Sequence, residues 1–164
     1  MRRAVVVLVS LLFVSSVSAQ TASFTSLTTP CPGNNGALVV TGLPKLGGSF
    51  QVPRIRFPMM CTRRFCGCNV GPCNVCTGSV LVLGLSQVSI PLPGGCSLQT
   101  TPDVLLFGAT TVNVPNNPTL SGFTFFLQRM DLALQEMITS SCTKAYVPTG
   151  FNGFSDLVKG VVGS

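Results

Sequence analysis

Cysteines are the residues of this chain best suited to chemistry, and five of the eight lie in the segment 61–76, CTRRFCGCNVGPCNVC. Cys66, Cys68, Cys73 and Cys76 have the short spacing that suits a tetrahedral four-thiolate zinc site. Cys73 and Cys76 alone have the spacing of a thiol–disulfide redox pair. The third interpretation is that all eight cysteines form disulfide bonds, for which eight residues allow 105 pairings.

The beginning of the chain favours the disulfide interpretation. Three residues, Met1-Arg2-Arg3, precede an apolar run at 4–14, and small residues follow at 17–19. This pattern predicts a secretory signal peptide of residues 1–19, and the run is shorter than the roughly 20 apolar residues of a membrane span. We expect a secreted protein, extracellular or at the cell surface, with the periplasm as the alternative and no membrane association after cleavage. Export oxidises thiols, so we expect neither a metal nor another cofactor.

Other reactive side chains are few. The chain has no histidine, which removes the imidazole base of Ser-His-Asp and Cys-His systems. Nothing in the sequence places two carboxylates on either side of a cleft, as a glycosidase requires. We therefore predict that the protein is not an enzyme. The four carboxylates are Asp103, Asp131, Glu136 and Asp156.

Basic residues are also sparse. Without Arg2 and Arg3, eight of the ten Lys+Arg remain against four Asp+Glu, which gives residues 20–164 a net charge of +4. Nucleic-acid-binding proteins usually show dense basic clusters, so we expect no nucleic-acid partner. One local patch stands out, and the simplest interpretation is solvated loop arginines, with a ligand site for anionic glycans as the alternative. The patch consists of Arg54, Arg56, Arg63 and Arg64.

Short apolar or alternating runs, separated by Gly, Pro and Asn turns, must position these residues. They predict an all-β fold, an antiparallel two-sheet β-sandwich of about eight or nine short strands in one domain of residues 20–148. A strand from 122 should end near Asp131, 61–76 should be an irregular loop, and 149–164 a weakly ordered tail. The other expected strands are 37–41, 49–55, 79–85, 86–92, 96–100, 104–107, 110–114 and 141–147.

The chain contains an ordered series of short motifs: Cys31-Pro32-Gly33, Leu43-Pro44, Leu46-Gly47, Leu83-Gly84-Leu85-Ser86, Pro91-Leu92-Pro93, Gly95-Cys96-Ser97-Leu98, Val114-Pro115-Asn116-Asn117-Pro118-Thr119-Leu120-Ser121-Gly122, Phe125 and Gln128. This series resembles a family of secreted, sandwich-like all-β domains of planctomycetes, myxobacteria and related environmental bacteria. In that family a "GC-x-L" segment precedes an "IPN-x-P-x-L-x-G…Q" segment, and the resemblance covers residues 31 to about 148.

The resemblance implies a bacterial extracellular module with no established activity, so no catalytic residues can be transferred. It also implies that the segment from about 54 to 76, where the chain departs from the family, is a cysteine-rich loop insertion. Cys31 and Cys96 lie in family-like motifs, which implies a framework disulfide between them. Five cysteines of the cluster then remain with Cys142, and because five is odd, Cys142 must pair with one of them. Pairing within the cluster stays open.

The expected function is a secreted, non-catalytic structural or adhesive module of the cell surface or extracellular matrix. Unpaired strand edges would allow self-association, or binding to surface and matrix polymers, by strand addition. The alternative is an extracellular module that binds a carbohydrate or anionic glycan through the disulfide-stapled loop with its arginines. Sugar-binding platforms favour Trp and Tyr, and this chain has no Trp and a single Tyr, Tyr146.

Overall fold

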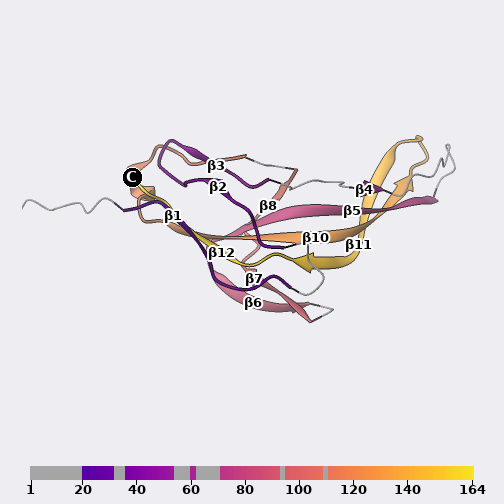
Figure 1. Cartoon of the computed structure of the whole chain (residues 1–164). Coiled ribbons are helices and arrows are strands. Elements are labelled where there is room, and N and C mark those ends of the chain that lie inside the picture. Colours follow the sequence, from indigo (N-terminus) through magenta and orange to yellow (C-terminus); the bar gives the residue numbers. More distant parts are fainter. Residues whose placement is uncertain (1–19, 32–35, 54–59, 62–70, 93–94, 109–110) are drawn as a thin grey trace, which may run out of the picture.

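The computed structural model describes residues 20–31, 36–53, 60–61, 71–92, 95–108 and 111–164. In these ranges the chain folds as an antiparallel β-sandwich (Figure 1). A single turn of 3₁₀-helix lies at Pro118–Leu120, and no helix of the described part is long and apolar enough to span a bilayer. The strands are β1 (Ser23–Ser26), β2 (Thr41–Gly42), β3 (Ser49–Gln51), β4 (Met60–Cys61), β5 (Gly71–Gly84), β6 (Gln87–Leu92), β7 (Cys96–Thr100), β8 (Val104–Phe107), β9 (Thr111–Asn113), β10 (Thr124–Ile138), β11 (Lys144–Phe154) and β12 (Val158–Val161).

The largest layer is a seven-stranded sheet, here called the main sheet, built around β5 and β10. Its path runs β1-β12-β10-β5-β4, while β11 pairs with β10 and β8 with β5. The pairs β5–β10 and β10–β11 are long antiparallel ladders. The two long central strands therefore hold β4, β8, β11 and β12 directly, and β1 through β12.

A three-stranded sheet of β2, β3 and β9 packs on one face of the main sheet and encloses the principal core. Leu81 of β5 and Leu127 of β10 face this core and are fully buried. Phe50 of β3 stacks on Phe125 of β10 at a centroid distance of 5.6 Å. Aromatic and branched side chains from two sheets fill such an interface by interdigitation, which is the basis of sandwich stability.

The hairpin β6–β7 covers part of the opposite face of the main sheet. Because side chains alternate along a strand, Val82, next to Leu81, points to this second face. There it packs with Leu98 of β7 and Phe154 of β11. Cys31 and Cys96 lie beside the same cluster, so the main sheet is buried on both faces near its centre.

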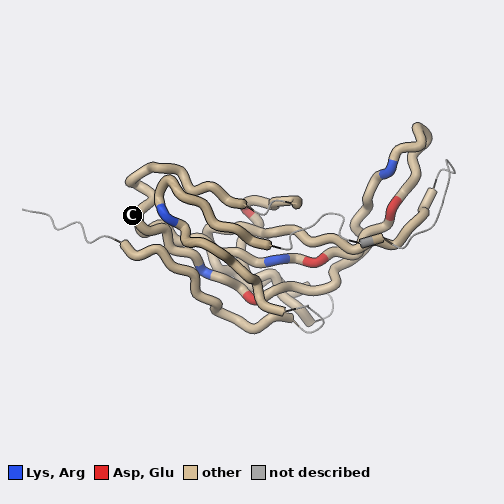
Figure 2. Tube along the Cα trace, turned by 45° about the horizontal axis from the view of Figure 1, so that its top comes forward, with Lys and Arg blue, Asp and Glu red and all other residues tan. Residues whose placement is uncertain are grey.

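Beyond the sandwich, the long strands continue as a projection that we call the arm. It consists of residues 71–79 of β5, 131–138 of β10, 144–153 of β11, and β4. Figure 1 shows it extending away from the layered region, and Figure 2 shows it from another side. A small separate core stabilises it, with Cys76, Leu132 and Leu134 buried.

Some sequence predictions are wrong at the level of elements. Of the strand expected at 37–41, only Thr41 lies in a strand, as the first residue of β2. The second half of the cysteine segment is strand rather than loop, because 71–76 pairs with β10 as part of β5. Likewise β10 does not end near Asp131 but continues to Ile138. In both segments the inward side chains include polar ones, Asn74 and Glu136, so the alternation of apolar and polar residues that signals a strand is interrupted.

The predicted weakly ordered tail is also wrong, and the domain extends to the end of the chain. β12 lies between β1 and β10 in the main sheet. Phe154 and Leu157 are fully buried and Val158 nearly so. Glycines are typical of flexible segments, but Gly160 and Gly163 permit close packing here: a Cβ at either would lie 2.3 Å from a neighbouring atom.

Replacing Gly160 with alanine should destabilise the protein by about 1–3 kcal/mol, the usual cost of overpacking a core. Gly160 is in register with Phe125, and an added Cβ would lie 2.3 Å from the ring's Cζ. Urea unfolding of Gly160→Ala and the parent measures the difference. Gly150→Ala on β11 is the matched control, since its Cβ meets no atom within 4 Å. Equal destabilisation by both variants would contradict the packing.

Candidate functional site

The described part of the cysteine segment forms a disulfide inside the arm. Cys61 of β4 is directly opposite Cys76 of β5 in the strand register. Their sulfur atoms are bonded and their Cα atoms lie 4.0 Å apart. Cys76 is buried in the arm's core with Leu132 and Leu134. The bond thus attaches the short strand β4 to the edge of the main sheet.

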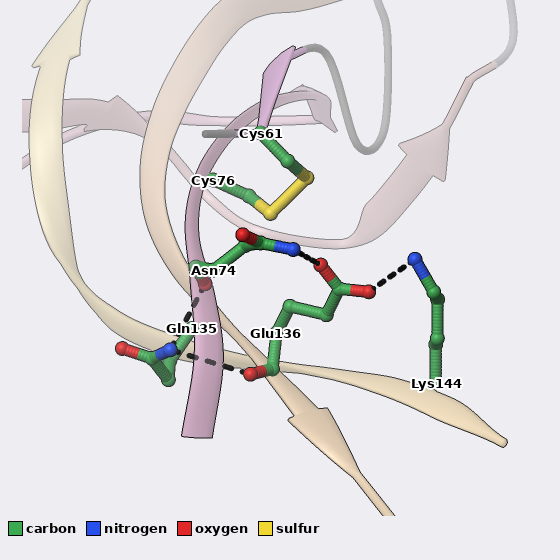
Figure 3. The surroundings of a disulfide bond; sticks show 6 residues. All are labelled: Cys61, Asn74, Cys76, Gln135, Glu136 and Lys144. Atoms are coloured by element: carbon green, nitrogen blue, oxygen red, sulfur yellow. Dashed lines mark hydrogen bonds and ion pairs between the residues drawn. A yellow bond between two sulfur atoms is a disulfide. The ribbon is translucent and has the colours of Figure 1, made fainter. Parts of the chain in front are cut away.

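A buried carboxylate lies next to this disulfide (Figure 3). The side chain of Glu136 is 1% exposed, and its Oε1 lies 2.6 Å from Nζ of Lys144 on the neighbouring strand β11. The Asn74 side-chain amide donates to Oε2 of Glu136. Gln135 Nε2 donates to the Asn74 carbonyl oxygen at 2.9 Å. These contacts connect β5, β10 and β11 around the buried carboxylate of Glu136.

The pKa of Glu136 is lowered, first by the hydrogen bond from Lys144 and then by that from Asn74, against the opposing effect of burial. The pKa of Lys144 is raised by the same contact. The carboxylate is therefore ionised and paired at neutral pH, and a general acid in this position would need the opposite shift. The arrangement is suited to holding strands together.

Metal binding and thiol redox chemistry both need free thiolates, which Cys61 and Cys76 do not offer while they are bonded to each other. The two sulfur atoms of the Cys61–Cys76 pair and a Glu136 oxygen lie within 4.8 Å of one another, as three metal ligands would. The sulfur atoms are joined in a disulfide, however, and metal coordination needs thiolates. The pairing also takes Cys76 out of the four-thiolate set and out of the proposed redox pair with Cys73.

Four of the remaining six cysteines are disulfide-bonded, and the other two lie outside the described residues. Cys31 is bonded to Cys96 across 65 residues of sequence, the pair implied by the family-like motifs. Cys73 and Cys142 are disulfide-bonded as well. Cys66 and Cys68 lie outside the described residues, as does the whole arginine patch of Arg54, Arg56, Arg63 and Arg64.

The other three carboxylates each make a local contact. The pKa of Asp103 is lowered, first by the hydrogen bond from Thr101 Oγ1 and then by that from Leu85 N at 2.7 Å. The pKa of Asp131 is raised by burial, although its Oδ1 lies 3.1 Å from Arg129 Nε.

Asp156 is 2% exposed and accepts from Ser26 Oγ and Leu38 N, so it joins β1 to the loop before β2. Along β10, Asp131 and Glu136 are an odd number of residues apart and so point to opposite faces. The two carboxylates of β10 therefore do not face each other as a catalytic pair would.

Asn74 and Lys144 were not predicted as site residues from the sequence, and Glu136 was considered only as one of the four carboxylates. The signal that could have found them is the every-second-residue series Leu132, Leu134, Glu136 and Ile138, in which all four side chains are buried. A charged residue inside such an apolar series predicts a buried, paired carboxylate. Finding its partners requires the strand register.

The arm should lose stability in acid because of Glu136. Its pKa is depressed in the folded state, so its contribution is fully present above the unfolded value of 4.5 and is lost as pH falls through the lower folded pKa. Glu136→Gln should flatten this acid limb. Hydrogen exchange of the β10 amides within the arm, 131–138, as a function of pH checks the prediction. Asp103 also has a lowered pKa but lies outside the arm, so Asp103→Asn should leave the acid limb of these amides unchanged. An unchanged acid limb in Glu136→Gln would contradict it.

Comparisons with protein-family models, with curated proteins and with solved structures found no match for this chain. The resemblance to secreted bacterial sandwich domains therefore remains a prediction from the motifs. The disulfides indicate folding in an oxidising extracellular or periplasmic environment.

Proposed function

We propose that this protein is a secreted, non-catalytic structural or adhesive module of the cell surface or extracellular matrix, which associates with further copies of itself through a sheet edge. The observation that supports this most is the character of β8, Val104–Phe107. It pairs with β5 on one side, and no other described strand pairs with its second side.

This edge is unusually apolar for one open to solvent. Val104, Leu105 and Phe107 are 44%, 42% and 56% exposed, and the sequence of the strand is VLLF. Soluble proteins normally protect such edges with lysine, proline or a bulge, because an unpaired apolar strand invites pairing with another chain. β8 contains none of these, so we identify it as the acceptor of strand addition.

Two further features support a structural role. Each of the four carboxylates is held by a hydrogen bond or an ion pair, and Asp131 and Glu136 point to opposite faces of β10, which favours structural over catalytic roles for them. Charged side chains are also sparse along the described chain (Figure 2). Electrostatic repulsion between copies is then small, and association through apolar edges is favoured.

A lysine on the edge should abolish this association. In Leu105→Lys we expect a shift to monomer by sedimentation velocity over a range of concentrations, whereas the oxidised wild type forms larger species. Leu43→Lys is the matched control, because Leu43 is 45% exposed but lies between β2 and β3, away from the edge. A monomeric wild type that binds specific sugars on a glycan array would favour the glycan-binding alternative.

A further inference from the structure

A pocket with mainly polar walls lies beside the Cys31–Cys96 disulfide. Its lining differs from the edge of β8, which is apolar. The pocket has a volume of about 170 Å³ and is bounded by the end of the N-terminal segment, the beginning of β7, and inward side chains of β10 and the β11–β12 connection. The residues that matter are Cys31, Cys96, Ser97, Gln99, Gln128 and Ser155. The disulfide fixes one wall of the pocket relative to the other.

The walls of the pocket carry hydrogen-bonding groups without charge. Gln128 is 1% exposed, and its Oε1 accepts from Gln99 N at 2.8 Å. Its Nε2 donates to the carbonyl oxygens of Ser155 and Ser97 at 3.2 and 3.4 Å. Ser155, also 1% exposed, accepts from Arg129 N. A buried amide held at both ends provides a rigid floor.

One polar atom of the pocket lining, Gln99 Oε1, has no hydrogen-bond partner among the described residues. The side-chain oxygen of Gln99 is buried, and no donor among the described residues bonds to it. The Gln99 Nε2 makes only a 3.5 Å contact with Ser97 Oγ. Buried acceptors are almost always satisfied, and an exception in a native structure needs an explanation. A ligand that donates a hydrogen bond would supply one.

Size and chemistry together restrict the ligand. An apolar cavity of about 150 Å³ accommodates benzene, so a pocket of this volume has room for one six-membered ring. The lining residues include no carboxylate or cation, which disfavours metal ions and anions. Amide and hydroxyl walls with an unsatisfied acceptor fit a ring that carries hydroxyl groups.

We propose that this pocket binds one ring of a neutral carbohydrate, with a sugar hydroxyl donating to Gln99 Oε1 and Gln128 holding the floor. The site is separate from the arginine loop and from the β8 edge. It therefore adds a binding function to the structural role and does not depend on that role.

Titration of the oxidised protein with glucose, galactose and N-acetylglucosamine, followed by ¹H–¹⁵N NMR, tests the proposal. We expect saturable shifts of the Ser97 and Gln99 amides and of the Gln128 side-chain NH₂ signals for at least one sugar. Gln99→Leu should weaken that binding by about tenfold, the cost of removing one hydrogen-bond partner. Gln51→Leu, an exposed glutamine of β3, is the matched control.

The same spectra check that each variant is folded, because the amide signals of the three-stranded sheet β2-β3-β9 should be unchanged. Absence of saturable shifts with all three sugars at tens of millimolar would overturn the proposal and indicate that only water fills the pocket. Glycerol offers hydroxyl groups without a ring, so glycerol shifts equal to those of the sugars would overturn the claim that a ring is recognised. Binding unchanged in Gln99→Leu would also overturn it.

Discussion

Phe154→Ala should destabilise the protein by about 3–5 kcal/mol, the usual cost of deleting a buried aromatic side chain. Phe154 is fully buried at the end of β11 and packs with Val82 and Leu98 between the main sheet and the hairpin. Cys31 and Cys96, which border this cluster, are fixed by their disulfide, so they cannot easily move into the cavity left by alanine. Denaturant unfolding monitored by circular dichroism measures the loss.

Phe151 provides the matched control on the same strand. Its ring lies 6.0 Å from that of Phe154, but its side chain is 45% exposed. Phe151→Ala should therefore cost much less. Truncation after Pro148 should abolish folding, because it removes β12 from between β1 and β10. A folded truncated protein, or a Phe154→Ala variant as stable as the parent, would show that the C-terminal segment is not part of the core.

Removal of the Cys31–Cys96 bond should cost about 4 kcal/mol, the chain-entropy value for a loop of this length. The bond spans 65 residues, and Cys31 N also donates to the Phe154 carbonyl oxygen, so the N-terminal segment is attached to the sandwich at this point. Urea unfolding of the double variant Cys31→Ser/Cys96→Ser under oxidising conditions gives the value.

The Cys61–Cys76 bond is the internal comparison. It spans 15 residues, for which the same relation gives about 3 kcal/mol. Because it lies in the arm, its loss should increase hydrogen exchange in the arm while the sandwich stays protected. If removing the arm bond unfolded the whole domain and removing the framework bond did not, the assignment of the two roles would be reversed.

The fold class follows from local patterns in the sequence. The alternating run at 86–92, the short run at 104–107 and the turn at Pro115–Pro118 are all local signals, and β6, β8 and the connection before β10 lie where they predict. β7 also coincides with its predicted range. Strand identity here depends on the nearest neighbours in sequence, so it can be read without the tertiary structure.

The arm and the C-terminal strands depend on partners far along the chain. The sequence around Cys73 and Asn74 indicates a loop, and only its pairing with β10 makes it a strand. The glycines of 149–164 indicate flexibility, whereas Gly160 is needed because the Phe125 ring packs directly against it. The Glu136–Lys144 pair likewise results from the register of β10 on β11. Propensity is a weak guide where long-range pairing determines the conformation.

The central claim, association through β8, is tested most directly by hydrogen–deuterium exchange of the oxidised wild-type protein at low and high concentration. Strand addition would place a partner strand along the side of β8 that faces away from β5, so exchange at 104–107 should slow as association proceeds, while the exposed β2–β3 turn is unchanged. In Leu105→Lys the slowing should be absent. Exchange at 104–107 that does not change with concentration, in a sample shown by sedimentation to associate, would contradict the account.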